Sequence, residues 1–433
     1  MKRSNITLAI STLTASLFLT ACNNGGGGGG SDNNAQPSTP SSYISETAYV
    51  NEADTLKDVA EASSVKVIKY KMPNVLGKTV ETSALVYFPT IAPPKDGYRM
   101  IVWTHGTLGG ADKCAPTKAG LGDRFNDFIA KNLLEQGYVI VAPDYEGLGG
   151  EGEHPYLNLP SEAKSALYAV KAAKEHYGTK LNGAWMSVGQ SQGGQASLGV
   201  AEYASADASY KGAVAGAPAS SLGKIILDIA PAAIDSLQAQ ESAGKAPAGT
   251  AAGTYATLLA YAALAGVGIT AYEPTFDYHE MFGSDSAKKI ADLAKTDCLD
   301  GIVNAYAQDI LKFLAASPAG TKVSDYPGIN RAEFEKNEVV KKFLSDYSQP
   351  TTKKLNKPIL IVQGVYDTNV PYTVTYDLYD KMSKAGTNVS MIPVPIAPSA
   401  SAPVVNGSHT GAILYATQTG QLRDFVKLYM PAQ

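Results

Sequence analysis

The sequence predicts an α/β protein whose mostly parallel sheet has helices on both faces and a helical insertion over one edge. From residue 98 to 220, short apolar segments alternate with segments of helical spacing. Such alternation is typical of a parallel sheet covered by helices on both sides. Residues 221–355 are rich in alanine and lack the alternation, which then resumes. We therefore expect a core in two parts, 43–220 and 356–433, and a helical cap formed by 221–355.

The individual elements follow from runs of apolar residues and from the residues that end them. Residues 65–73 and 80–89 are expected to form a strand pair joined by a turn at Gly77. The other expected strands are 98–106, 138–144, 183–191, 212–220, 358–364 and 388–395. Helices are expected over 124–138, 161–178, 194–204 and 372–385 and from 411 onward, with Ser161 as the N-cap of the second.

The N-terminus has the pattern of an export signal. Lys2 and Arg3 precede an uncharged, mostly apolar stretch, so residues 1–21 are predicted to be a signal peptide. The stretch ends in "LTAC", which resembles the lipobox of bacterial lipoproteins, so Cys22 is the expected lipidation site. An ordinary signal peptide with an incidental cysteine is the alternative. Residues 22–42 are rich in Gly, Ser, Asn and Pro and are predicted to be a flexible tether.

These features predict a protein of the bacterial cell envelope that is held to a membrane by an N-terminal lipid anchor. Residue 23 is Asn rather than Asp, which by analogy with enteric bacteria favours the outer membrane. The formal net charge is −4 and no basic run occurs, so nucleic acid is not an expected partner. No spaced Cys/His cluster is present, so no metal site is expected.

The cysteines bear on the compartment as well. The chain has three, and lipidation of Cys22 leaves Cys114 and Cys298. In an oxidising compartment, two remaining thiols are expected to form one disulfide. Two separate buried thiols remain the alternative.

The stretch "GQSQGGQ", residues 189–195, is the strongest candidate for chemistry. It follows an expected strand and opens an expected helix, which is the setting of a G-x-S-x-G nucleophile elbow. Gly189 and Gly193 allow strand and helix to approach in a sharp turn, which would present the Ser191 hydroxyl above the sheet edge. The backbone N–H of Gln192 would point into the same space. A purely structural turn would not require serine at its apex.

A serine nucleophile needs a base and a carboxylate that orients the base. In this arrangement the chain order is Ser, then Asp or Glu, then His. His409 is the only histidine placed late enough, in the loop "NGSHTG" before the last helix. Asp367 directly follows the strand 358–364 and is expected at the same sheet edge, whereas Asp377 and Asp380 are weaker candidates. A surface histidine and a turn aspartate are the alternatives.

The remaining catalytic part is a second N–H donor for an oxyanion, expected from the loop "THGTLGG" after an early strand. Gly106 or Thr107 is the candidate donor, while His105 is expected to orient the loop.

Two other stretches have structural interpretations. The stretch 144–146 is expected to have a structural hydrogen-bonding role rather than to line the site. Residues 246–272 carry no charge. They are expected to form a buried cap helix, with an acyl-binding or interface-touching lid as the open alternative.

Together these motifs resemble the α/β-hydrolase superfamily, and specifically the bacterial branch of the secretory lipase family. The matching segments are "WTHGTLG", "DKCAP", "YVIVAPDYEGLG" with "HPY", "GQSQGGQ", "VQGVYDTNVP" and "GSHTGA". The resemblance implies a carboxylic ester hydrolase that needs no cofactor and uses Ser191, Asp367 and His409 as its triad. It also implies a cap at 221–355 and pairing of Cys114 with Cys298. The lipobox and the glycine-rich tether depart from a freely secreted lipase, so they argue against release into the medium.

The expected substrate is a small-molecule or lipid ester, either triacylglycerol or an ester of a shorter acid. Aromatic acyl esters such as hydroxycinnamates are an alternative, because the chain has 25 Tyr that offer stacking surface. A peptidase on the same scaffold is a less favoured possibility. A catalytically silent envelope lipoprotein that binds a ligand is an alternative from a different class.

Overall fold

The computed structural model describes residues 41–50, 59–399, 401 and 404–433. These residues belong to one compact unit, Ser41–Gln433. The predicted signal peptide, the lipidation site Cys22 and nearly all of the predicted tether lie outside the described residues, so these assignments stay predictions.

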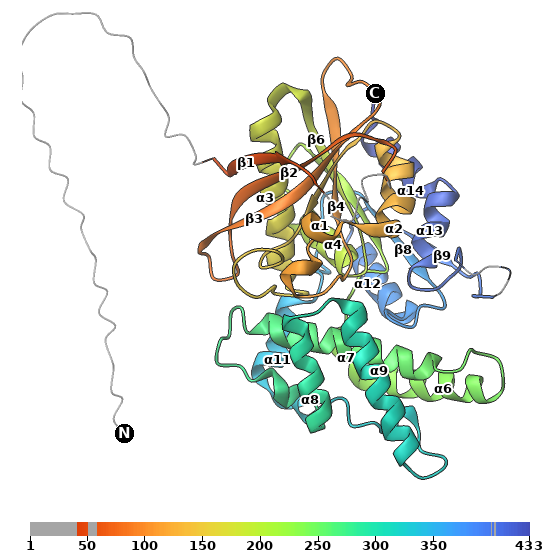
Figure 1. The fold of residues 1–433 in the computed structure, drawn as a ribbon. Coiled ribbons are helices and arrows are strands. Elements are labelled where there is room, and N and C mark those ends of the chain that lie inside the picture. The colour runs from red at the N-terminus through yellow and green to blue at the C-terminus, as the bar shows by residue number, and fades with distance from the viewer. Residues whose placement is uncertain (1–40, 51–58, 400, 402–403) are drawn as a thin grey trace, which may run out of the picture. The chain divides into compact units, whose positions relative to one another are not determined.

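The centre of the molecule is a nine-stranded sheet with the order β1-β2-β3-β5-β4-β6-β7-β8-β9 (Figure 1). The first four strands in this order pair antiparallel, and from β5 onward every neighbouring pair is parallel. The strands are β1 Tyr43–Ala48, β2 Ala62–Pro73, β3 Thr79–Pro89, β4 Tyr98–Thr104, β5 Val139–Pro143, β6 Leu181–Gln190, β7 Tyr210–Gly216, β8 Ile359–Gly364 and β9 Val389–Val394. The mostly parallel sheet expected from the sequence is confirmed.

Helices cover both faces of this sheet because the strand residues alternate between two buried clusters. Val102 and Ile361 face α3, α4 and α12, whereas Ile101 and Leu360 face the other layer. The first layer consists of α3 Leu159–Tyr177, α4 Gln192–Tyr203 and α12 Tyr372–Lys384. The second consists of α2 Gly122–Phe125, a π-helical segment Asn126–Leu134, α13 Gly411–Gln418 and α14 Gln421–Tyr429. A short helix, α1 Pro116–Ala119, lies in the loop after β4. Burial on both faces explains why the central strands are apolar throughout their length.

Between β7 and β8 the chain is helical and forms its own buried cluster of side chains. In Figure 1 these helices lie together beyond one edge of the sheet. They are α5 Leu222–Lys224, α6 Ala230–Ser242, α7 Thr250–Ile269, α8 Asp285–Ala291, α9 Leu299–Ala316, α10 Arg331–Lys336 and α11 Glu338–Lys342. We call this group the cap.

Helix α7 is the uncharged element of the cap. Among the described residues it is the one helix long and apolar enough to cross a membrane. However, 72% of its most apolar window is buried inside the protein. Helix α7 therefore lies at the centre of the cap cluster, where its alanine and glycine residues allow neighbouring segments to approach closely.

Three local details differ from the sequence-based expectation. β1 was not anticipated; it pairs antiparallel with β2 at the edge of the sheet. Helix α3 begins earlier than expected, because Asn158 rather than Ser161 is the N-cap and its side chain accepts the Ser161 N–H. The expected helix 124–138 is π-helical over Asn126–Leu134.

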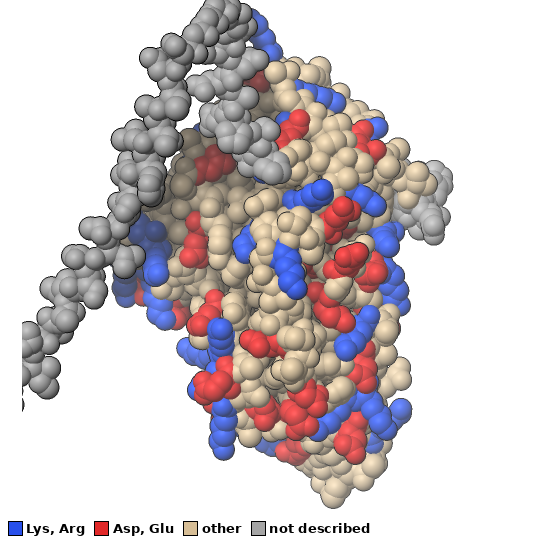
Figure 2. Space-filling view, turned by 90° about the vertical axis from the view of Figure 1, so that its left-hand side faces the viewer, with Lys and Arg blue, Asp and Glu red and all other residues tan. Residues whose placement is uncertain are grey.

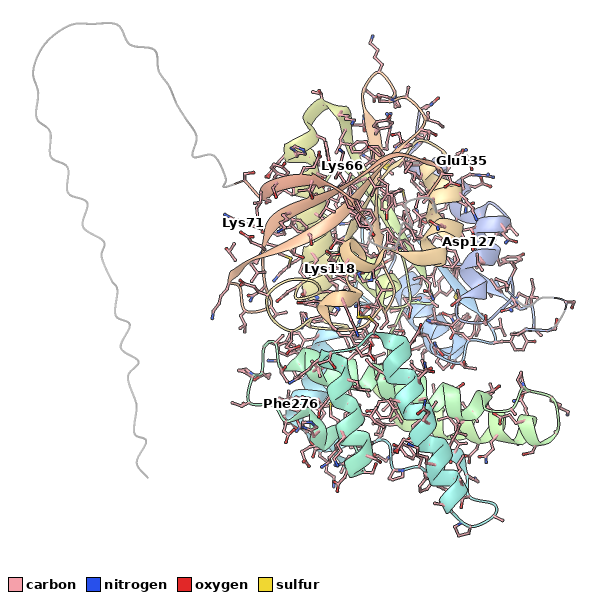
Figure 3. The ribbon with its side chains drawn as sticks, viewed as in Figure 1. Lys66, Lys71, Lys118, Asp127, Glu135 and Phe276 are labelled. Atoms are coloured by element: carbon pink, nitrogen blue, oxygen red, sulfur yellow. A yellow bond between two sulfur atoms is a disulfide. The ribbon has the colours of Figure 1, made fainter. Side chains whose placement is uncertain are left out.

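Charged side chains are spread over the surface. On the face shown in Figure 2, acidic and basic side chains are interspersed rather than gathered by sign. The charged residues labelled in Figure 3, including Lys66 and Glu135, belong to the sheet part of the molecule, whereas Phe276 belongs to the cap. The face in Figure 2 therefore shows no surface of a single sign.

Candidate active site

The turn between β6 and α4 has the backbone of a nucleophile elbow. Ser191 has φ 62° and ψ −121°, a conformation that costs a non-glycine residue of the order of 1–3 kcal/mol. A hydrogen bond of 2.8 Å from its N–H to the carbonyl oxygen of Gly216 holds it there. A Cβ atom at Gly193 would lie 1.8 Å from the carbonyl oxygen of Thr104, and one at Gly189 would lie 2.1 Å from that of Gly193. Both glycines are therefore required by close approach, as the sequence predicted.

Three residues from distant parts of the chain meet at this turn. The Ser191 hydroxyl oxygen lies 2.9 Å from Nε2 of His409, and Nδ1 of His409 lies 2.8 Å from an Asp367 carboxylate oxygen. Ser191 directly follows β6, Asp367 follows β8 and His409 precedes α13. Because the carboxyl ends of parallel strands lie on the same side of the sheet, the three side chains converge there. Sequence reasoning named all three, and the structure brings them within hydrogen-bonding distance.

The Asp367 carboxylate is fixed by four contacts. One oxygen accepts the N–H groups of Asn369 and Val370, both at 2.9 Å, in a turn that leads into α12. The other accepts the Gln363 side-chain amide at 3.0 Å in addition to the His409 contact. The carboxylate side chain has no solvent exposure. This arrangement holds the imidazole of His409 with its Nε2 directed at Ser191.

The loop that carries His409 is anchored to the elbow itself. The Gln190 side-chain amide donates to the backbone oxygen of His409 at 3.2 Å. Gly407 lies so close to the chain around β9 that a Cβ atom would be 2.4 Å from the backbone oxygen of Val394. The histidine side chain itself is 11% exposed. It is therefore oriented from both sides while remaining accessible to a small molecule.

The candidate oxyanion loop lies directly beside the elbow. A Cβ atom at Gly106 would lie 3.8 Å from the Cβ of Ser191. Gln192 is the first residue of α4, so its N–H has no partner inside the helix. The Thr107 hydroxyl is 2.7 Å from the Tyr156 hydroxyl, and both residues are buried. Gly106 and Gln192, two of the expected oxyanion donors, therefore adjoin Ser191, whereas Thr107 is placed by its contact with Tyr156. The role of Tyr156 beside Thr107 was missed by sequence reasoning.

His105 has the structural place expected for it. Its Nδ1 lies 2.8 Å from the carbonyl oxygen of Gly106, and its own carbonyl accepts the Tyr145 hydroxyl at 3.0 Å. Burial lowers the pKa of His105 to about 4, so the ring is neutral at neutral pH. It steadies the loop and does not contact Ser191 in any hydrogen bond of the described residues.

The stretch 144–146 is also engaged in structural hydrogen bonds. The Asp144 carboxylate accepts the Ser83 hydroxyl at 2.5 Å and both the N–H and the hydroxyl of Thr117. Burial raises the pKa of Asp144 to about 6, although these hydrogen bonds oppose the shift. Glu146 accepts the Ser161 hydroxyl at 2.5 Å. These groups tie the loop after β5 to β3 and α3.

A narrow apolar cavity of about 60 Å³ lies between Ser191 and the cap. Ser191 and Gln192 form part of its wall. The rest is mostly apolar side chains of the cap and the loop before α3, including Tyr156, Leu157, Ile225, Leu258, Tyr261 and Phe343. A second cavity of about 300 Å³ lies within the cap and shares Ile226 and Leu258 with the first. The candidate nucleophile therefore faces hydrophobic space.

A disulfide links the cap to the loop after β4. The sulfur atoms of Cys114 and Cys298 are bonded, and the two residues are 184 positions apart. Beside it, the N–H of Leu299 donates to the carbonyl oxygen of Leu108 at 2.8 Å, and Gly109 forms a bridge with Cys298. The alternative of two separate buried thiols is wrong.

Within the part of the chain that the structure describes, no group of His, Cys, Asp and Glu is arranged to hold a metal ion.

Comparison with known proteins agrees with the class of molecule expected from the motifs. Residues 119–241 match the secretory lipase family model. This segment includes the elbow with Ser191. The chain has no match among curated protein sequences.

Solved structures with a similar fold include hydrolases of the lipase and esterase class. The rice cell wall degrading esterase LipA from Xanthomonas oryzae is 18% identical with a TM-score of 0.59, over 89% of this chain and 97% of that one. Candida antarctica lipase A in its closed state is 16% identical with a TM-score of 0.62, over 90% and 83% of the two chains. At these identities the likeness concerns the fold, which is the α/β-hydrolase fold. Together with the family match, it supports an ester hydrolase of the lipase and esterase class.

Proposed function

We propose that this α/β-hydrolase is a serine carboxylic ester hydrolase in which Ser191 is the nucleophile, His409 the base and Asp367 the orienting acid. The observation that carries the proposal is the continuous hydrogen-bond chain from the Ser191 hydroxyl through both nitrogens of His409 to Asp367. The strained elbow backbone and the secretory lipase match over 119–241 support it.

In the first step, the Ser191 oxygen attacks the acyl carbon of an ester while Nε2 of His409 takes the hydroxyl proton. The new imidazolium is stabilised by the Asp367 carboxylate on Nδ1. The Ser191 oxygen–carbon bond forms as the carbonyl π bond opens to an oxyanion. The backbone N–H of Gln192, with that of Gly106 or Thr107, would stabilise this charge, and loss of one such donor typically lowers turnover by about 10² to 10³.

In the second step, the tetrahedral intermediate collapses and the bond to the alcohol oxygen breaks. His409 returns its proton to the departing alcohol, which leaves an acyl ester on Ser191. A water molecule then attacks this ester with His409 again as the base, and the acid is released with the Ser191 hydroxyl restored. No step needs a cofactor, so an ester and water are the only reactants.

The apolar cavity supports acyl esters as the substrate class. Its walls offer few groups that could pair with a polar acid portion, whereas hydrocarbon gains about 25 cal/mol per Å² of buried area there. Its volume of about 60 Å³ holds only the reacting end of a chain. A longer acyl chain would have to displace Ile226 or Leu258 to enter the larger cavity in the cap.

Aromatic acyl esters are the second candidate. Four aromatic residues, Tyr156, Tyr261, Phe334 and Phe343, line the cavity beside Ser191. The structural neighbour from Xanthomonas oryzae is itself described as a cell wall degrading esterase. Stacking of a planar acid between such rings is worth about 0.5–1.5 kcal/mol per ring pair beyond the buried area.

The test is hydrolysis of p-nitrophenyl esters from acetate to palmitate, with a feruloyl ester measured alongside. Ser191→Ala should abolish hydrolysis. Ser197→Ala is the matched control, because this buried serine lies in α4 just after the elbow and its hydroxyl donates to the Ser187 hydroxyl at 2.8 Å. The chain-length profile separates lipase, short-chain esterase and aromatic esterase. If the folded protein hydrolyses none of these esters, the proposal is wrong and a peptidase or a silent ligand-binding lipoprotein is favoured.

We further propose that the protein works outside the cytoplasm, anchored in the bacterial cell envelope through Cys22. The disulfide and the secretory family match support an extracytoplasmic protein. The lipobox-like "LTAC" and the glycine-rich stretch behind it favour anchoring over release. A tether of about 20 residues of this composition would span roughly 25 Å on average, which would leave the body free to reach esters near the membrane.

A further inference from the structure

The glutamine that follows the candidate nucleophile directs its side chain into a buried polar cluster. The Gln192 amide nitrogen lies 2.7 Å from Oε1 of Glu162 and 3.0 Å from Nε2 of His154. An amide NH₂ has two hydrogens, so each contact uses one of them. His154 then accepts at Nε2 and carries its own proton on Nδ1, which lies 2.8 Å from the backbone oxygen of Glu146. All three side chains are buried.

Glu162 also holds the wall of the cavity beside Ser191. Its Oε1 accepts the N–H of Leu157 at 3.0 Å as well as the Gln192 amide. Leu157 has φ 57°, a left-handed conformation that is unfavourable for leucine and needs external support. Leu157 and Gln192 both line the cavity. One carboxyl oxygen therefore restrains two residues that face the candidate reaction space.

This arrangement is costly for the fold. The second oxygen of Glu162 is buried with no hydrogen-bond partner in the described residues. An unpartnered buried polar atom typically costs about 1–3 kcal/mol, and a well-packed apolar side chain would avoid that cost. Burial raises the pKa of Glu162 to about 8 and lowers that of His154 to about 4. At neutral pH the cluster therefore consists mainly of neutral groups joined by directional hydrogen bonds.

A role in ester hydrolysis would explain why this destabilising cluster is present. The backbone N–H of Gln192 is at the start of α4, next to Ser191 in the chain, and has no partner within the helix. We propose, building on the proposed hydrolase function, that Glu162 and His154 are positioning residues that hold the Gln192 side chain so that its backbone N–H stays directed at the oxyanion. Neither residue touches the reacting atoms. Both act through the orientation of Gln192.

Gln195 offers a matched comparison within the same helix. It is as deeply buried as Gln192, and its side-chain amide donates to the backbone oxygens of Leu157 and Ser348, at 3.3 and 2.5 Å. Its N–H is engaged with the Ser191 carbonyl oxygen inside the helix. Substitution by methionine therefore removes two buried hydrogen bonds at either position, but only at 192 does it release an oxyanion donor.

The experiment compares Gln192→Met, Gln195→Met and Glu162→Gln in the full chain, with kcat and KM for p-nitrophenyl butyrate and the Ki of an alkyl boronic acid. Gln192→Met should lower kcat about 10- to 100-fold, less than the complete loss of a donor. KM should change less than threefold, and boronic acid affinity should fall with kcat because that adduct mimics the tetrahedral intermediate. Gln195→Met should lower Tm but keep kcat within threefold. Glu162→Gln retains the acceptor oxygen and should also keep kcat within threefold.

The outcomes separate this proposal from the one it rests on. If Ser191→Ala retains wild-type activity, the hydrolase proposal fails. A second outcome is that activity depends on Ser191 while Gln192→Met has the kcat of the wild type, or a kcat lowered no more than that of Gln195→Met. In either case the cluster is structural, and the positioning role is refuted. Should Gln192→Met fail to fold, Glu162→Leu tests the same network from the other side, with the same expected loss of kcat and the same refuting result.

Discussion

Replacing Glu162 by glutamine should remove a specific part of the pH dependence of stability. Burial raises the pKa of this carboxyl group to about 8, from the 4.5 that is ordinary for glutamate. Between these two values the folded protein holds the proton while the unfolded chain releases it. Folding therefore takes up a proton in this window, and the free energy of unfolding falls as pH rises from 4.5 to 8. Glutamine cannot titrate, so Glu162→Gln loses this slope.

The size of the effect follows from the shift. The difference of 8 − 4.5, or about 3.5 pKa units, corresponds to about 5 kcal/mol at 1.36 kcal/mol per unit. We expect a measured change of about 2–5 kcal/mol, because the folded structure relaxes around a buried charge. Glutamine retains the oxygen that accepts from Leu157 and Gln192, so the two proteins should differ little near pH 4.5. Glu162→Gln should become the more stable protein as pH approaches 8.

The measurement is urea unfolding of both proteins at intervals from pH 4.5 to 8, expressed as the difference in unfolding free energy. Other buried groups titrate in or near this range, including Asp144, whose pKa is raised to about 6 by burial, and His105, whose pKa is lowered to about 4. They are present in both proteins and cancel in the difference. Glu338→Gln, at a carboxylate whose side chain is 83% exposed, is the control for loss of one acidic residue. A difference that stays constant across this pH range would refute the conclusion that burial holds Glu162 protonated.

Four further outcomes are expected. Replacing Cys114 and Cys298 together by serine should lower the unfolding free energy by about 2–5 kcal/mol, since the bond closes a loop of 184 residues, and urea unfolding would show it. Gly193→Ala should yield insoluble or inactive protein, because its methyl group would overlap backbone at 1.8 Å, and a soluble variant with normal ester hydrolysis would contradict the elbow geometry. Leu258→Ala should raise the rate on palmitate relative to butyrate by joining the two cavities, and an unchanged ratio of kcat/KM values would show that acyl chains take another path. Cys22→Ala should move the protein from the membrane fraction to the soluble fraction, as followed by immunoblotting, and unchanged fractionation would argue against the lipid anchor.

The candidate triad could be located from sequence because each member obeys a rule that links local pattern to position. Ser191 lies in a glycine-bounded turn, and Asp367 directly follows a buried strand. In a parallel sheet, strand ends meet at one edge, so these two positions and the loop with His409 had to be near one another once the alternation of strands and helices was recognised. The topology brings the three side chains together, and local hydrogen bonds to Asp367 and to the His409 loop then fix the contacts of 2.9 and 2.8 Å.

Other features had no such local signal. β1 lies at the sheet edge, and its residues vary in burial, so the alternation that identifies a strand is weak there. Helix α3 begins at Leu159 because Asn158 competes successfully with Ser161 for the cap, and both residue types are good N-caps. Propensity alone does not decide between two such candidates. The disulfide between the loop after β4 and the cap was expected from the cysteine count, because lipidation of Cys22 leaves only Cys114 and Cys298. The count left two separate thiols open, and only the family resemblance favoured the pairing over that alternative.

The polar cluster behind Gln192 shows why sequence-based site prediction ends at the residues that carry a motif. His154, Glu162 and Gln192 come from a loop and two different helices, and no spacing rule relates them. Each has an ordinary alternative role when taken alone: a loop histidine, a first-turn glutamate and a glutamine in an elbow. Only their burial together, with every hydrogen of the Gln192 amide engaged and one Glu162 oxygen unpartnered, distinguishes the cluster from structural packing. The unpartnered oxygen lowers the stability of the fold, so the cluster is not explained by a contribution to folding. Its place directly behind the candidate oxyanion donor is the reason to seek its role in turnover.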